Sequence, residues 1–122
     1  MGKIVTFRDL NVWKESHKLA LKIYIITNKF PKSEIYGLTS QMRSCAVSIT
    51  SNIAEGFSRR HFKEKIQFYS ISLGSLTELQ SQILISKDIG FLNLDDFNNL
   101  DNKMITIHKL LNGLIKSSRR LN

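Results

Sequence analysis

The sequence predicts an all-α protein, an antiparallel up-and-down four-helix bundle, and three observations lead to that prediction. Apolar residues recur at helical spacing along almost the whole chain. Pro and Gly together make only seven of the 122 residues. Four amphipathic stretches of about 18 to 27 residues with short connections favour antiparallel neighbours. Residues 1–122 are therefore expected to form a single domain, with helices over about 10–28, 36–54, 61–87 and 94–116.

The first two helices are separated by Pro31, which cannot continue a helix and therefore marks the connection between them. Thr6 or Asp9 can open the first helix, because both side chains accept hydrogen bonds from backbone N–H groups. An apolar stripe predicts one buried face on the second helix. Gly56 is expected to terminate that helix.

The third helix has Glu64 at the third position of a capping box. Apolar or small residues cover more of its circumference than one neighbouring helix can bury, which predicts a further packing partner. Asn93 is expected to cap the fourth helix, whose apolar stripe is the most regular in the chain. The terminal residues 1–6 and 116–122 are expected to fray.

The chain is strongly basic, with 18 Lys and Arg against 10 Asp and Glu and a net charge of +8 at pH 7. This balance favours a polyanionic partner such as RNA, DNA or an anionic membrane surface. No apolar run reaches the roughly 18 residues that cross a bilayer, and no signal peptide is recognisable. The single Cys45 cannot form a disulfide within its own chain. These features predict a cytoplasmic protein without a membrane-spanning segment.

The sequence contains no recognisable catalytic or metal-binding constellation. No Glu precedes a His by three residues, as di-metal bundles require, and no Arg lies four to six residues before a His, as in one class of helical ribonucleases. Cys45 lies on the apolar stripe of the second helix and is interpreted as a buried, inert thiol rather than a nucleophile. We therefore expect no enzymatic activity, no cofactor and no metal.

Four polar residues interrupt the apolar stretches of the second and third helices: Arg43, Asn52, Glu55 and Glu78. They could form an anion-binding or catalytic cluster. We favour a structural alternative, in which Arg43 pairs with Glu55 or Glu78 in a partly buried network. Such a network would fix the register of the helices or a subunit interface, because an unpaired buried charge is strongly unfavourable.

Basic residues that could contact nucleic acid form three groups. The candidates are Lys14, Lys18, Lys22, Arg59, Arg60, Lys63, Lys65, Arg119 and Arg120. The first three share one face of the first helix, which is either a solvated face or a phosphate-facing strip. The next four surround the start of the third helix, where free backbone N–H groups suit a phosphate. The last two belong to a basic tail. Most aromatic residues lie on core stripes, so the binding expected is directed at the backbone rather than at bases.

Several motifs of this chain resemble those of one known family. Residues 36–43 (YGLTSQMR) and 51–56 (SNIAEG) resemble the signature of four-helix-bundle proteins related to the 23S rRNA intervening-sequence protein. Residues 7–13 (FRDLNVW) and 73–75 (LGS) fit the same pattern, and the motifs together cover residues 7 to about 92.

The resemblance implies a bacterial, cytoplasmic, non-enzymatic bundle that forms a ring-shaped homopentamer. It also implies nucleic-acid binding in one branch of the family, the accessory proteins of diversity-generating retroelements. Five copies would carry about +40, which turns weak patches into a multivalent surface. We therefore predict binding of RNA or DNA through backbone phosphates.

Two other functions remain open. The first alternative is a protein-interaction scaffold whose partner is an unidentified protein encoded nearby, with the charge serving solubility. A membrane-surface role ranks third, since no predicted helix joins a basic face to a fully exposed apolar face.

Overall fold

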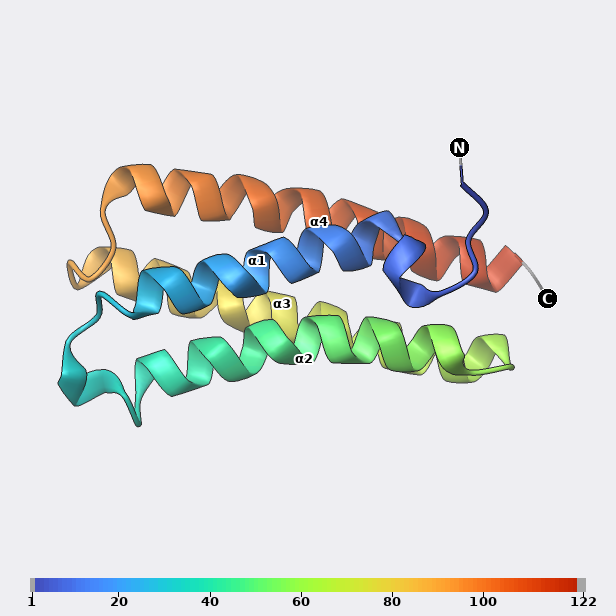
Figure 1. Cartoon of the computed structure of the whole chain (residues 1–122), viewed down its shortest axis with the longest axis horizontal. Coiled ribbons are helices and arrows are strands. Elements are labelled where there is room, and N and C mark those ends of the chain that lie inside the picture. The colour runs from blue at the N-terminus through green and yellow to red at the C-terminus, as the bar shows by residue number, and fades with distance from the viewer. Residues whose placement is uncertain (1, 121–122) are drawn as a thin grey trace.

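The computed structural model describes residues 2–120 and consists of four long antiparallel helices (Figure 1). The helices are α1 (Asn11–Thr27), α2 (Leu38–Ser58), α3 (Phe62–Asp88) and α4 (Leu94–Arg120). Each helix packs beside the next in the chain, and α4 closes the bundle against α1. Short 3-10 turns at Phe7–Asp9 and Lys32–Glu34 precede α1 and α2. The all-α prediction is confirmed, with no strand between residues 2 and 120.

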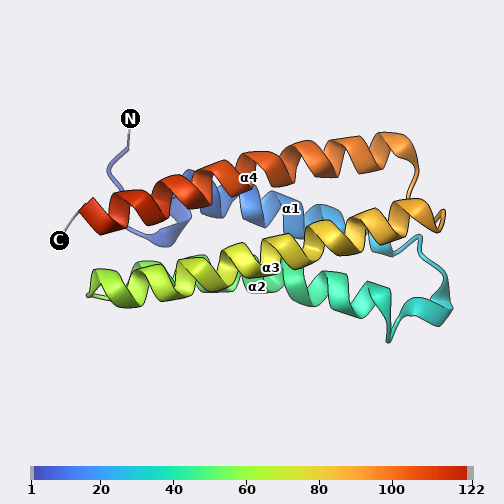
Figure 2. The same ribbon diagram turned by 180° about the vertical axis from the view of Figure 1, so that it is seen from behind.

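The up-and-down path sorts the connections between the two ends of the bundle. The N-terminal segment, the α2–α3 turn and the end of α4 lie at one end, as both views show (Figures 1 and 2). The α1–α2 and α3–α4 connections lie at the opposite end. Residues far apart in the sequence are therefore gathered at the same end of the molecule.

The core is formed by the apolar stripes that the sequence predicts, and every helix contributes to it. Its fully buried side chains include Leu19, Ile23, Met42, Ile49, Ile53, Leu76, Leu79, Ile83, Leu100, Met104, Ile107 and Leu111. Burial of each such side chain stabilises the fold by roughly 1.5–3 kcal/mol, before the entropy of ordering the chain is subtracted.

Two helix-capping predictions have distinct outcomes. Thr6 and Asp9 do form a capping box: Thr6 Oγ1 accepts from Arg8 N at 3.2 Å, and Asp9 Oδ2 accepts from Thr6 N at 2.9 Å. The box caps the 3-10 turn rather than α1. The predicted cap of α4 is confirmed, because Asn93 Oδ1 accepts from Asp96 N at 2.8 Å.

The expectation that Gly56 ends the second helix is wrong. Helix α2 continues through this residue to Ser58, and Gly56 is buried against α3. A Cβ atom at Gly56 would lie only 2.6 Å from Cε1 of Tyr69. Glycine is thus needed at this position for the close approach of two helices, not for termination.

The expectation of a frayed basic tail from residue 116 is also wrong for the residues described. Helix α4 extends to Arg120, and the side chains of Ile115 and Ser118 are buried. The Ser118 hydroxyl donates to the carbonyl of Leu114 at 2.8 Å. Tertiary packing extends the helix beyond the last strongly apolar position. Residues 121 and 122 lie outside the described part of the chain.

Candidate nucleic-acid interface

One end of the bundle carries nearly all of the net positive charge. This basic end consists of residues 2–14, 55–65 and 109–119, which the helical path brings together (Figure 1). These three segments contain ten Lys and Arg against three Asp and Glu, a net charge of +7 out of the +8 of the whole chain. A concentration of charge of one sign produces a local potential that attracts polyanions.

The α2–α3 turn presents two exposed cations at this end. Arg60 and Lys63 are exposed, and neither forms an ion pair with any residue between 2 and 120. Arg59 is held by its own helix, because its Nη2 atom donates to Glu55 Oε2 at 2.9 Å. Its guanidinium also packs 4.6 Å from the ring centroid of Phe68. Arg60 and Lys63 are therefore better placed for an external phosphate than Arg59.

Lys65 is engaged with its own chain rather than held towards solvent. Its Nζ atom donates to the carbonyls of Phe57 at 2.7 Å and Gly56 at 3.3 Å. These carbonyls end α2, where the helix dipole favours a cation. Partial burial lowers the pKa of the Lys65 ammonium. Lys65 therefore caps the end of α2, and its contact with a phosphate stays a prediction.

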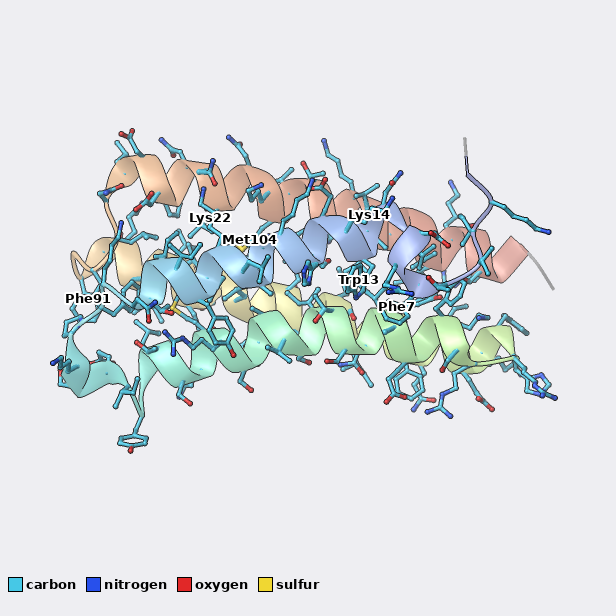
Figure 3. The ribbon with its side chains drawn as sticks, viewed as in Figure 1. Phe7, Trp13, Lys14, Lys22, Phe91 and Met104 are labelled. Atoms are coloured by element: carbon cyan, nitrogen blue, oxygen red, sulfur yellow. The ribbon has the colours of Figure 1, made fainter. Side chains whose placement is uncertain are left out.

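The lysines of the predicted strip on α1 do not all lie at the basic end of the bundle. Lys14 and Lys22 both lie along α1 (Figure 3), about 12 Å apart at 1.5 Å per residue. Lys14 belongs to the basic end and is exposed. The Lys18 ammonium lies 3.6 Å from Glu15, and the Lys22 ammonium donates to Asn99 Oδ1 on α4.

The last group joins the basic end as an ordered part of α4. Arg119 is exposed on this helix, whereas the side chain of Arg120 lies outside the described residues. Sequence reasoning missed Lys3, Arg8 and Lys109, which contribute to the same end. The predicted up-and-down path contained the signal, because the N-terminus, the second connection and the C-terminus of such a bundle lie at one end.

The predicted network around Arg43 does not form within one chain. The Arg43 guanidinium extends towards α1, where Nε donates to Thr27 Oγ1 at 2.9 Å and Nη2 donates to Asn28 Oδ1 at 3.0 Å. The guanidinium also lies 4.7 Å from the ring centroid of Tyr24. No carboxylate between residues 2 and 120 forms an ion pair with Arg43.

The other members of that network have separate partners. Glu55 pairs with Arg59, and the Asn52 amide donates to the carbonyl of Ser48 at 2.8 Å. Glu78 accepts hydrogen bonds from the Cys45 thiol at 3.1 Å and from the Gln82 amide at 3.3 Å. Arg43 and Glu78 do not meet within one chain because Glu78 lies beside Cys45, and residues 43 and 45 point about 200° apart on a helix.

Cys45 is buried, as its place on the apolar stripe predicted. Burial and the neighbouring Glu78 carboxylate raise the pKa of the thiol to about 11. A thiol that stays protonated is a poor nucleophile.

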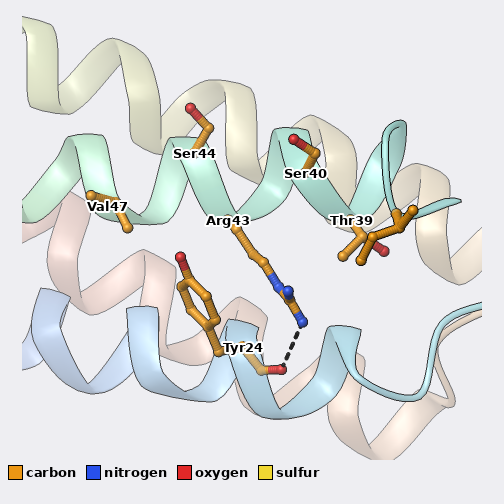
Figure 4. Close-up of a pocket in the computed structure, with 7 residues that line it drawn as sticks. Tyr24, Thr39, Ser40, Arg43, Ser44 and Val47 are labelled. Atoms are coloured by element: carbon orange, nitrogen blue, oxygen red, sulfur yellow. Dashed lines mark hydrogen bonds between the residues drawn. The ribbon is translucent and has the colours of Figure 1, made fainter. Parts of the chain in front are cut away.

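An open groove of about 450 Å³ surrounds Arg43 between α1 and α2 (Figure 4). Arg43 and Tyr24 project into the space between the two helices, and the Arg43 Nη2 atom donates to the Tyr24 carbonyl at 3.5 Å. The remaining lining residues are Ile35, Thr39, Ser40, Ser44 and Val47. The groove thus combines a fixed cation, hydroxyl groups and apolar side chains.

Neither a cluster of metal ligands nor a membrane-spanning helix occurs among residues 2–120. No three His, Cys, Asp or Glu side chains in this range are grouped as ligands of one metal ion. None of the helices described has an apolar stretch long enough to cross a membrane.

The fold and the charge distribution define a basic, antiparallel four-helix bundle. The model of the 23S rRNA-intervening sequence protein family matches residues 8–113, and the chain belongs to this family. A search of curated proteins finds no match. The structure is similar to the crystal structure of a protein of unknown function from the S23 ribosomal protein family of Bacteroides thetaiotaomicron. The TM-score is 0.79 at 20% sequence identity, over 86% of this chain and 95% of that chain. At this identity the similarity concerns the fold alone.

Proposed function

We propose that this protein is a non-enzymatic, ring-forming homopentamer that binds RNA or DNA through backbone phosphates at its basic end. The observation that carries the proposal is the concentration of +7 of the net charge at one end of the bundle. Neutralising phosphates releases counterions from the nucleic acid, which is the main source of sequence-independent affinity.

The exposed side chains of the basic end support phosphate contacts rather than recognition of bases. Arg60, Lys63 and Arg119 are exposed and lack ion-pair partners among residues 2–120. The guanidinium of Arg59 lies over the nearby ring of Phe68, which leaves less of this ring for stacking on a base. We therefore expect little dependence on nucleotide sequence.

Self-association is supported by apolar surface that one chain leaves uncovered. Ile71 and Ile85 on α3, and Ile89 directly after this helix, are each about half exposed. Parallel copies in a ring would place their basic ends on one face and make the binding multivalent.

The test compares two charge reversals that change the net charge equally at opposite ends of the bundle. Arg60→Glu with Lys63→Glu alters the basic end, and Lys29→Glu with Lys32→Glu alters exposed lysines at the other end. Binding to a labelled RNA and a labelled DNA of mixed sequence is measured by fluorescence anisotropy at several salt concentrations. The first variant should reduce the slope of log K against log salt by about 2 per bound chain, whereas the second should leave it unchanged.

Two outcomes would contradict the proposed binding. One is the absence of wild-type binding at low salt. The other is an equal loss of affinity in both variants, which would indicate a response to net charge rather than a defined surface. Light scattering of the wild-type protein tests the assembly separately, since five chains of 14.0 kDa have a mass of about 70 kDa.

A protein-interaction scaffold is the second candidate, and exposed apolar residues near the opposite end favour it. Tyr36 is 95% exposed, and Leu21 and Ile25 on α1 are more than half exposed. Such patches often mark protein interfaces. A partner that is captured with the protein and survives nuclease treatment would support this function over nucleic-acid binding.

A further inference from the structure

We propose that Arg43 of one copy of this chain pairs with Glu78 of a second copy, so that two bundles associate side by side and point in the same direction. This proposal rests on the self-association included in the proposed function, and it specifies which surfaces of the two copies meet. The two side chains each lack an oppositely charged partner among residues 2–120 of their own chain.

Arg43 presents a fixed cation surrounded by apolar and hydroxyl-bearing side chains. Its guanidinium is oriented by neutral acceptors on α1, so its formal charge has no compensating carboxylate there. The groove around it is open to solvent, and Tyr24, Ile35 and Val47 in its lining are each more than 40% exposed. Arg and Tyr among apolar side chains are the residues enriched in the cores of protein interfaces.

Glu78 provides the complementary surface on α3. Its carboxylate is oriented by two neutral donors, the Cys45 thiol and the Gln82 amide. Ile71 and Ile85 lie two helical turns before and after it, and they are 46% and 49% exposed. This part of α3 therefore presents a fixed negative charge between two exposed isoleucines, which complements the positive charge and the exposed apolar side chains of the Arg43 groove.

The two charges lie at the same level along the bundle. Cys45 contacts Glu78 and follows Arg43 by two residues, which corresponds to an axial offset of about 3 Å. Two copies that point the same way and are not shifted along the helix axis therefore bring Arg43 opposite Glu78. This arrangement places the basic ends of all copies on one side of the assembly, as the proposed function requires.

The surface of α2 between the two charges includes several small side chains. Ser40 and Ser44 point away from α1 (Figure 4), and Ser51 is exposed two turns further along. Small side chains allow a neighbouring helix to approach closely and exclude water. An ion pair enclosed in this way is stronger than one in bulk solvent.

The experiment measures self-association of the full chain by multi-angle light scattering over a concentration series. Arg43→Glu and Glu78→Arg are studied alone and then mixed in equal amounts. Each variant alone should associate about 30-fold or more weakly than wild type. The mixture should gain mass over either variant alone, because the unchanged Arg43 and Glu78 meet across one contact and the two reversed side chains meet across the next. A closed ring of five would keep one contact between like charges, so the mixture is expected to form open chains or rings of even number rather than the complete wild-type ring.

Control variants distinguish the effect of losing the Arg43–Glu78 ion pair from the effects of changed net charge and of misfolding. Lys29→Glu and Asp88→Arg change the charge by the same amounts at other exposed positions, and they should associate like wild type. Circular dichroism reports on folding of each variant. If a reversal disturbs folding, Glu78→Gln decides, because it removes the charge while keeping an acceptor oxygen for Cys45 and Gln82.

Wild-type association in either reversal variant or in Glu78→Gln would overturn the pairing, as would a folded mixture that does not gain mass. A monomeric wild-type protein would overturn both the pairing and the ring. Self-association that does not depend on the pair would leave the proposed function intact. Conversely, absence of nucleic-acid binding at low salt would overturn the proposed function, while the masses would still decide the pairing.

Discussion

Replacing Gly56 with Ala should destabilise the bundle, although the same change stabilises most helices. Gly56 lies inside α2 and faces Tyr69 of α3. An added Cβ would lie 2.6 Å from Tyr69 Cε1, 2.8 Å from Cδ1 and 3.1 Å from Phe68 Cβ. Tyr69 is only 2% exposed, so its ring has little room to move. The helices must separate, or the ring must leave its preferred position.

The expected magnitude is the sum of two opposing contributions. Alanine gains about 1 kcal/mol over glycine through its helix propensity. Overpacking a buried contact costs about 1–3 kcal/mol, and two approaches below 3.0 Å place Gly56→Ala at the upper end of that range. The free energy of unfolding should therefore fall by about 1–2 kcal/mol.

Gly113→Ala is the matched control, because it makes the same chemical change inside α4. No atom lies within 4 Å of a Cβ built at Gly113, so only the propensity gain of about 0.5–1 kcal/mol applies. Urea unfolding monitored by circular dichroism at one chain concentration gives both values. A difference of about 2 kcal/mol corresponds to about 8 °C in Tm for a chain of this length. Equal stability of the two variants would refute the close-packing argument.

Two further predictions concern single groups. The unfolding free energy should decrease as pH rises from about 9 to 11, because Cys45 ionises near its ordinary pKa of 9.0 when unfolded, whereas burial and Glu78 raise its pKa to about 11 in the folded chain. Cys45→Ala should remove this part of the alkaline decrease, and an unchanged pH profile would contradict it. Gly90 has a φ of +88°, so Gly90→Ala should cost about 1 kcal/mol in the same urea assay. A neutral effect there would show that the α3–α4 turn can adopt another conformation.

Most of the fold could be predicted because the signals for helices involve residues that are close together in the sequence. The cap at Asn93 and the apolar stripes act over one or two turns, and the structure confirms them. The end of the second helix could not be predicted in this way. Glycine commonly terminates helices, and only the presence of Tyr69 on another helix explains why α2 continues through Gly56.

The candidate site was predictable as a list of cations, but not as a surface. Sequence spacing identified Arg60 and Lys63, which are exposed, but it could not distinguish them from Lys65, whose ammonium caps α2. It also proposed a contact of Arg43 with Glu55 or Glu78, which the helical path prevents within one chain.

Helical period, capping chemistry and net charge are properties of neighbouring residues, so they already specified four amphipathic helices and a basic protein. The partner of each side chain and the position of the charge depend on how the helices are placed around one another. Packing of α3 against one side of α2 joins Cys45 to Glu78, while Arg43 faces α1 on the other side. The alternating direction of the helices gathers three separate basic segments at one end, because chain ends and the middle turn meet there.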